Sequence, residues 1–284
     1  MSEGRHGPPG TVRPRRFRPR FHWELLACGV SGHELIGTDA ETLRPEDELF
    51  ARERDGVRWY RCLRCDSWLP LPPPASPDRE TPPAREEVEL PLRGKALRDK
   101  IVLRAIAIDR ALHFVVLGLL AVAVFLFAAH EVRVRDAVYR IVNAVQGTSG
   151  DPTTHSHGIL HSLLHVFTLR SSTLYAVAAA AAAYAVLEGV EAVGLWYQRR
   201  WAEYLTFVAT CAFFPYEIYE LSKTVSPFKV VAIVVNVAIA VYLLYAKRLF
   251  GLRGGAEADE EERARDVGWE ALERTAPRPP AAAA

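Results

Sequence analysis

The sequence predicts an all-α integral membrane four-helix bundle, joined to a small β-rich, zinc-ribbon-like cytoplasmic module and to disordered tails. Two patterns carry this prediction: four long apolar stretches occur in the second half of the chain, and a Cys–His pair followed by a Cys-x-x-Cys pair occurs near the start. The mean hydropathy of +0.01 conceals this partition. A net charge of +1 excludes a strongly cationic nucleic-acid binder and a strongly acidic tail protein, and four cysteines exclude a disulfide-rich secreted scaffold.

The four apolar stretches have the length of membrane-spanning helices. The first contains no Asp, Glu, Lys or Arg, and at 1.5 Å per residue it covers about 28 Å of a hydrocarbon core that is about 30 Å thick. The others hold a few carboxylates or an asparagine, and beside the first they are interpreted as spans. The predicted spans are residues 111–129, 174–197, 202–221 and 230–246.

The distribution of basic residues predicts the orientation of these spans. The first residues, MSEGRHGPPGTVRPRR, contain no apolar segment of a signal peptide. With a cytoplasmic N-terminus, eleven Lys and Arg residues flank the inner ends of the spans and six flank the outer ends. We therefore expect a multi-pass protein of the inner (cytoplasmic) membrane, embedded in the lipid bilayer, with both termini cytoplasmic.

Residues 21–70 form the predicted zinc-ribbon-like module. Cys62 and Cys65 lie in WYRCLRCDSW, a strand–CxxC–strand pattern typical of a zinc knuckle, in which two thiolates bind one tetrahedral Zn²⁺ from a tight turn. Cys28 and His33 supply the second pair of ligands. A structural zinc ion is expected because about fifty residues with few large aliphatic side chains build little core.

Other interpretations of these ligands stay open. His22 is an alternative fourth ligand. A thioredoxin-like redox motif needs a βαβ context that this region lacks. A pair of surface thiols without metal would leave the nearby Cys28 and His33 without a role.

The remaining segments complete the predicted organisation. Residues 1–20 are a disordered basic arm that could contact anionic lipid or nucleic acid, although a solvated arm is the commoner outcome. Residues 71–94 are a Pro-rich linker, residues 95–250 form the membrane domain, and residues 251–284 are a mostly disordered tail with a short helix near Asp266–Arg274.

Ionisable residues inside the spans are candidates for function because burying them in lipid is costly. Glu188 and Glu191 are spaced i,i+3 and share one helix face. The helical rise places Arg110 and His113 in the same layer, and we expect these two to neutralise the carboxylates. The favoured role is structural: ion pairs and hydrogen bonds between these residues hold the helices together. A proton or ion pathway and a catalytic site are less favoured. The intramembrane polar candidates are Arg110, His113, Glu188, Glu191, Glu217, Glu220 and Asn236.

The predicted outer loop contains four histidines. His157, His161 and His165 are spaced by four, so a helix would place them along one stripe, where two could chelate a metal; His155 lies just before them. A polar helix face is the favoured interpretation. No Ser-His-Asp, Walker-type or dinucleotide-binding glycine motif is evident, so an enzyme is the less favoured class.

The segment LEGVEAVGLWYQRRWAEYLTFVATCAFFPYEIYEL, residues 187–221, together with the last span that carries Asn236, resembles a bacterial family of predicted membrane proteins, domain of unknown function 2127. The resemblance runs from about residue 97 to residue 249 and leaves out the zinc-ribbon-like module. It implies a small four-span bundle and brings no activity, cofactor or catalytic residue.

Two functions from different classes follow. The favoured one is a non-enzymatic adaptor or regulator whose zinc module binds a cytoplasmic protein or nucleic acid. The alternative is a small transporter or proton-coupled channel that uses the intramembrane carboxylates, and it requires a homo-oligomer because four spans rarely enclose a pathway. A metalloenzyme built on the outer histidines is a weaker third interpretation.

Overall fold

The computed structural model describes residues 21–54, 56–130, 170–223 and 225–276. The chain divides into two compact units. The terminal unit comprises Met1–Val102 with Leu244–Ala284, and the helical unit comprises Leu103–Leu243. The predictions for the basic arm and for the outer-loop histidines fall outside the described residues.

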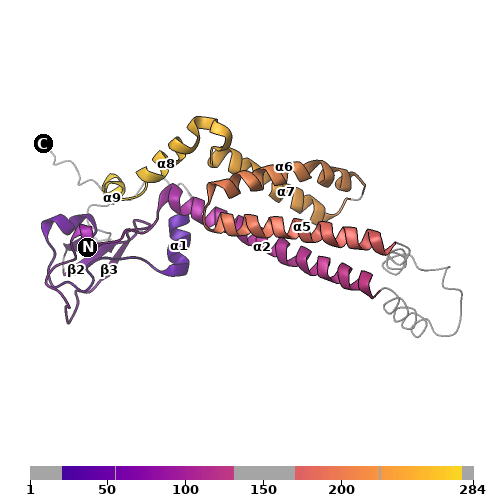
Figure 1. Ribbon diagram of the computed structural model, residues 1–284. Coiled ribbons are helices and arrows are strands. Elements are labelled where there is room, and N and C mark those ends of the chain that lie inside the picture. The colour runs from indigo at the N-terminus through magenta and orange to yellow at the C-terminus, as the bar shows by residue number, and fades with distance from the viewer. Residues whose placement is uncertain (1–20, 55, 131–169, 224, 277–284) are drawn as a thin grey trace. The chain divides into compact units, whose positions relative to one another are not determined.

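The terminal unit contains a small antiparallel sheet (Figure 1). Its strands, in the order β1-β2-β3, are β1 (Ala51–Arg54), β2 (Val57–Arg61) and β3 (Trp68–Leu71). Tyr60 of β2 lies opposite Ala51 on one side and Leu69 on the other. The other elements of this unit are helix α1 (Trp23–Ser31), the short helical turns η1 (Pro45–Leu49), η2 (Arg85–Glu87) and η4 (Leu249–Gly254), helices α8 (Gly255–Arg265) and α9 (Trp269–Thr275), and the first turns of α2 (Gly94–Ala129).

A compact apolar core lies around this sheet. Tyr60 is fully buried at its centre, and the proline-rich segment contributes Val88 and Leu90. The C-terminal helix α9 contributes Leu272 and Trp269. The buried members of the core are Ile36, Phe50, Ala51, Tyr60, Leu63 and Leu272. The core is thus assembled from three separate parts of the sequence, only one of which is the predicted module.

The proline-rich segment 71–94 packs as part of the terminal unit, whereas the sequence predicts a linker. The carbonyl of Arg79 accepts a hydrogen bond from the N–H of Glu41 at 2.9 Å. The Arg44 guanidinium donates to the carbonyl of Pro82 at 3.0 Å. Proline lacks an N–H but keeps its carbonyl, so an extended proline-rich chain can still bond to a neighbouring segment.

The C-terminal region also differs from the mostly disordered tail that the sequence predicts. Helices α8 and α9 occupy Gly255–Arg265 and Trp269–Thr275. Leu272 is only 1% exposed. The buried Arg61 guanidinium donates to the carbonyl of Leu272 at 3.0 Å and to the hydroxyl of Thr275 at 2.7 Å. Burial of α9 side chains supplies the apolar area that the small N-terminal module lacks.

Truncating the α9 side chain at the core tests this packing. We expect Leu272→Ala to lower the free energy of unfolding of the terminal unit by about 2–5 kcal/mol, because it leaves a cavity in a small core. Exposed Glu270 on the same helix provides the matched control, Glu270→Ala, with a change below about 0.5 kcal/mol. Hydrogen exchange of β2 in the full-length protein is the measurement. Equal protection in both variants would contradict the packing.

The N-terminus of α2 is capped by carboxylates from distant segments. Glu24 accepts a hydrogen bond from the N–H of Gly94 at 2.8 Å, and Asp266 accepts one from the N–H of Lys95 at 2.8 Å. Gly94 has a φ of 58°, and an added Cβ would lie 2.2 Å from Asp266 Oδ2, so only glycine fits here. The acidic caps satisfy helix N–H groups that would otherwise lack partners.

A buried charge network joins the first turns of α2 to the C-terminal segment. Lys95 Nζ lies 2.8 Å from Asp259 Oδ1. Lys247 Nζ lies 3.4 Å from both Asp99 and Asp259. All four side chains are buried. Within the terminal unit, the pairing holds the first turns of α2 beside Lys247 and helix α8.

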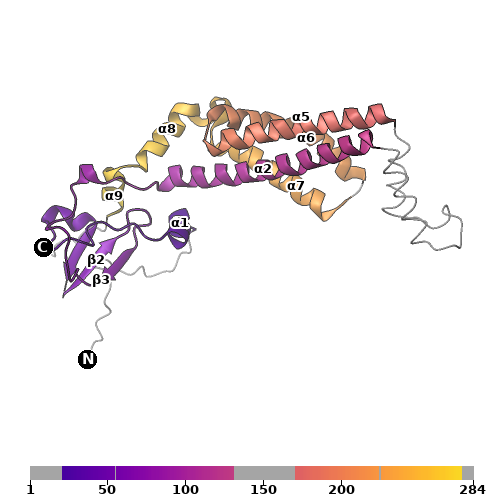
Figure 2. The same cartoon turned by 60° about the horizontal axis from the view of Figure 1, so that its bottom comes forward.

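The helical unit consists of four helices. They are the remainder of α2, α5 (Ser171–Trp196), α6 (Arg200–Lys223) and α7 (Pro227–Val241), the last followed by a π-helical turn, η3 (Tyr242–Ala246). Helices α2 and α5 run side by side in Figures 1 and 2, α5 packs on α6, and α6 packs on α7.

Within the described part of the chain, three helical segments are long and apolar enough to cross a membrane. These are Gly94–Ala129, Ser171–Trp196 and Lys229–Arg265. Helix α6 covers the third predicted span but is not among the three. Its charged residues are Arg200, Glu203, Glu217, Glu220 and Lys223. The four-span count therefore stays a prediction.

Candidate metal centre and buried polar cluster

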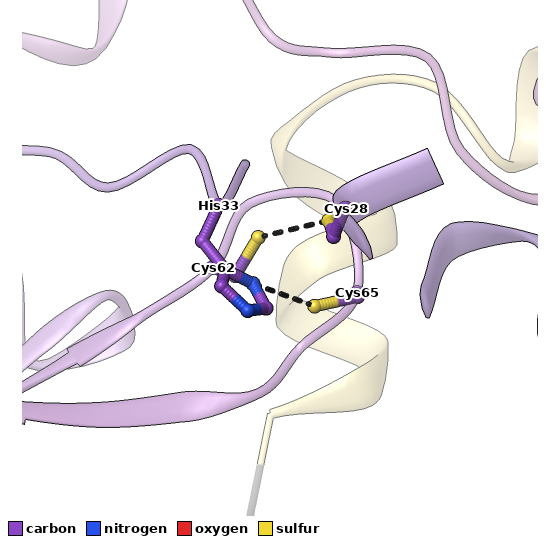
Figure 3. A group of neighbouring side chains, drawn as sticks. All are labelled: Cys28, His33, Cys62 and Cys65. Carbon is purple, nitrogen blue, oxygen red and sulfur yellow. Dashed lines mark hydrogen bonds between the residues drawn. The ribbon is translucent and has the colours of Figure 1, made fainter. Parts of the chain in front are cut away.

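Four side chains with metal-binding atoms converge in the terminal unit (Figure 3). Cys28 projects from α1, and His33 follows that helix directly. Cys62 and Cys65 lie on the turn between β2 and β3. The structure therefore brings together the four residues that the sequence predicts as ligands.

Backbone hydrogen bonds shape the turn that carries the Cys-x-x-Cys pair. The N–H of Cys62 donates to the carbonyl of Ser67 at 2.8 Å, and the N–H of Asp66 donates to the carbonyl of Cys62 at 3.1 Å. The N–H of Leu63 donates to the carbonyl of Glu34 at 2.9 Å, which fastens the segment after His33 to the same turn. These bonds direct both thiols toward one point.

Two of the donor–donor distances match the edges of a tetrahedral metal site. The four donor atoms all lie within 4.8 Å of one another. Cys28 Sγ lies 3.7 Å from Cys62 Sγ, and Cys65 Sγ lies 3.4 Å from His33 Nδ1. A tetrahedral Zn²⁺ with its usual bond lengths has sulfur–sulfur edges of about 3.8 Å and sulfur–nitrogen edges of about 3.5 Å. All four cysteines of the chain are free thiols.

The surroundings shift the pKa values of two of these thiols in opposite directions. Burial, with hydrogen bonds to Cys65 and Cys62, raises the pKa of Cys28 to about 12. Burial also acts to raise the pKa of Cys62, but hydrogen bonds from the backbone of Cys65 and Arg64 and from His33 outweigh it and lower that pKa to about 7. The turn thus stabilises a thiolate at Cys62, the form that binds metals.

A second layer of contacts supports the turn. Asp66 accepts from the buried Arg61 guanidinium at 2.7 Å and from Arg93 at 2.5 Å. Arg61 also reaches Thr275, so the turn is tied to β2 and α9. Sequence reasoning missed these residues, since lone arginines in a charged segment carry no distinguishing pattern.

The other metal candidates do not join this cluster. Among the described residues, no second group of three or more Cys, His, Asp or Glu side chains is placed to hold a metal ion. His22, the alternative fourth ligand, caps α1 and is not a member. Cys211 lies on α6. His155, His157, His161 and His165 lie outside the described residues.

A buried polar cluster lies between three helices of the helical unit. Arg110 of α2 donates to both carboxylate oxygens of Glu188 on α5, at 3.1 and 3.3 Å, and to the hydroxyl of Thr210 on α6 at 3.1 Å. Its Nε lies 3.7 Å from Glu191 Oε2. Glu188 and Glu191 are 1% and 0% exposed. The structure thus pairs Arg110 with the two carboxylates.

His113 does not take part in this cluster, contrary to the sequence prediction. Its side chain is about half exposed, and its Nδ1 lies 2.9 Å from the carbonyl of Asp109 and 3.7 Å from the carboxylate of the same residue. His113 follows Arg110 by three residues, which turns it about 60° around the helix axis. That rotation directs the ring away from Glu188.

The second carboxylate pair of the sequence prediction bonds to side chains of helix α7. Asn236 donates to Glu217 Oε1 at 2.6 Å. Lys229 lies 3.2 Å from Glu220 Oε2. These contacts join α6 to α7 and explain why both acids and the asparagine occur in apolar stretches.

Three buried polar residues of α6 were not predicted. Thr206, Thr210 and Glu203 are 0%, 4% and 2% exposed. The i,i+4 spacing of the threonines places them on one face, which is the signal that could have identified them.

Three apolar helical segments of sufficient length and a separate Cys/His cluster define an integral membrane protein with a candidate metal centre in its terminal unit. The chain belongs to the family described as predicted membrane protein, DUF2127, whose model matches residues 102–247. The resemblance in the sequence is thereby confirmed.

Curated relatives share more of the chain than this family segment. Uncharacterized protein Rv0090 of Mycobacterium tuberculosis and uncharacterized protein Mb0093 of Mycobacterium bovis are each 38% identical over 248 residues, 87% of this chain and 92% of the relative. Only 37 residues follow residue 247, so the match must include much of residues 1–101. No solved structure matches the chain.

Proposed function

We propose that this protein is a non-enzymatic adaptor of the bacterial inner membrane, whose zinc-stapled cytoplasmic module binds a protein partner. The observation that carries the proposal is the convergence of Cys28, His33, Cys62 and Cys65, with donor atoms within 4.8 Å of one another, in a unit with its own apolar core. Closed sites with four protein ligands are structural, because no position is left for water or substrate. The cluster therefore serves to hold a module together.

The proposed topology has four spans and two cytoplasmic termini. Segments from both ends of the chain pack into the terminal unit, as the bonds from Arg61 to Leu272 and Thr275 exemplify. Two ends that pack together lie on the same side of the membrane, which requires an even number of crossings. Three apolar segments and α6 supply four. Free thiols suit the reducing cytoplasm.

A surface pocket on the module supports a protein partner over a nucleic acid. The pocket has a volume of 710 Å³ and runs beside β1, which is an edge strand of the sheet. The pocket is lined by side chains of both charges, four arginines and three glutamates. A nucleic-acid surface would be uniformly basic, whereas mixed charge suits a polypeptide segment. The charged lining residues are Glu41, Arg44, Glu48, Arg52, Glu53, Arg54 and Arg58.

Photo-crosslinking in native membranes tests the adaptor function. A photoreactive amino acid placed at Glu48, in the pocket, is expected to capture a discrete partner in the full-length protein. The matched position is Ser76, which is exposed on the same unit outside the pocket. Capture at Glu48 should be lost in the Cys62→Ser/Cys65→Ser background. Capture that is the same at both positions, or unchanged without the thiols, would count against the adaptor.

A further inference from the structure

The buried polar cluster of the helical unit contains more negative than positive charge. Glu188 and Glu191 are fully buried on one face of α5, and the cation that contacts them is Arg110 of α2. Tyr184 of α5 lies beside Glu188. Helix α6 presents the hydroxyls of Thr206 and Thr210, and its buried Glu203 lies one turn before Thr206.

The guanidinium of Arg110 makes hydrogen bonds to one carboxylate and only a longer ion-pair contact to the other. Its hydrogen bonds go to Glu188 and to Thr210. It approaches Glu191 only through Nε, at 3.7 Å from Oε2 and without a hydrogen bond. Both oxygens of Glu191 lack a hydrogen-bond partner, although the side chain is 0% exposed. The hydroxyl of Thr206 is also fully buried and lies beside Glu191, where it is a neutral group that can donate or accept a hydrogen bond.

An ionised carboxylate is the least suitable species for this position. A buried charge is tolerated where it is fully paired, and the guanidinium that contacts Glu191 gives its hydrogen bonds to Glu188 and Thr210 instead. A proton on Glu191 removes the uncompensated charge, and the hydroxyl of Thr206 beside it can accept a hydrogen bond from the protonated carboxyl. We propose that the buried cluster is a proton-binding site and that its proton resides on Glu191.

A metal cation fits the cluster less well than a proton. A hard cation requires several oxygen ligands around one point. Within the described residues, the carboxylates of Glu188, Glu191 and Glu203 are not a group placed to hold a metal ion. A proton needs a single oxygen and one acceptor, which Glu191 and Thr206 provide.

Infrared difference spectroscopy of the full-length protein in lipid nanodiscs tests the site directly. Across a pH titration, we expect the carbonyl stretch of a protonated carboxylic acid, and we expect Glu191→Gln to abolish it. Glu217→Gln is the matched control, because Glu217 already accepts a hydrogen bond from Asn236, and it should leave the band in place. Thr206→Val should keep the band but shift its frequency, since the acceptor is lost.

The outcomes separate the proposal from its competitors. A wild-type protein without the band, or a band that persists in Glu191→Gln, overturns it. A Glu191 signal that responds to sodium at fixed pH also overturns it in favour of an alkali-metal site. Should Glu191→Gln fail to fold, labelling of the wild type with dicyclohexylcarbodiimide, which attacks protonated carboxyls in apolar surroundings, replaces it. Peptide mass spectrometry should find the adduct on Glu191; an adduct confined to Glu188 contradicts the assignment.

This site is independent of the adaptor function. Removing metal from the terminal unit should leave the Glu191 band unchanged, so failure of one proposal does not affect the other. Glu191 is one of the carboxylates that the proton-coupled alternative would use, and the spectroscopic measurement assumes nothing about transport.

Discussion

Replacing Cys62 and Cys65 with serine is expected to reduce bound zinc from about one ion per chain to none and to unfold the module around the sheet. Structural zinc contributes about 10–16 kcal/mol to the folding of small domains, more than a core built on three short strands supplies. Elemental analysis of the purified full-length protein measures the metal, and hydrogen exchange of β2 and β3 measures the unfolding.

The fourth cysteine provides the control for this experiment. Cys211 lies on α6 and is not a member of the cluster, so Cys211→Ser should retain both the zinc and the exchange protection. A protein that holds as much zinc without Cys62 and Cys65 would show that the ligands lie elsewhere. A double variant that loses metal yet keeps its protection would show that the ion does not stabilise the fold.

Removing the cation of the buried polar cluster has the second large effect. Arg110→Met leaves Glu188 and Glu191 without the guanidinium that contacts both. Breaking a buried pair from one side costs about 3–5 kcal/mol, because the remaining charge stays desolvated. We therefore expect a loss of this size in the apparent free energy of unfolding, measured by detergent-driven denaturation of the purified protein.

Two variants make this prediction specific. Arg110→Met combined with Glu188→Met replaces the pair by apolar side chains and should recover most of the loss, as buried pairs elsewhere do when both partners are replaced. Arg199→Met removes an exposed arginine at the turn between α5 and α6 and should have little effect. Equal losses in Arg110→Met and Arg199→Met would show that the buried pairing does not support the fold.

Local patterns in the sequence were sufficient to predict the four candidate metal ligands and the positions of the apolar helices. The Cys-x-x-Cys spacing requires a tight turn, and a turn between two strands of β-branched, aromatic and apolar residues is what the structure has from Cys62 to Ser67. That the apolar stretches are helical follows from hydropathy, since every backbone group of a spanning segment must bond within its own helix.

The sequence was insufficient wherever distant segments meet. Arg61 bonds to Leu272, 211 positions away, and no local pattern distinguishes that arginine from its neighbours. The proline-rich composition of residues 71–94 predicted a linker. Composition does not show that the backbone carbonyls of prolines can still accept hydrogen bonds from a neighbouring segment. In the same way, spacing placed His113 and Arg110 in one layer but could not say which of them faces Glu188.

The sequence by itself determined that this is an integral membrane protein of its family, where its apolar helices lie, and which four residues form the candidate metal centre. Only the tertiary structure decided that the C-terminal helix α9 completes the core of the terminal unit, and that Arg110 makes hydrogen bonds to Glu188 and none to Glu191. The physical reason is that periodicity and ligand spacing are properties of neighbouring residues. Which helix faces meet, and how one guanidinium is shared between two acids, depends on packing across the whole chain.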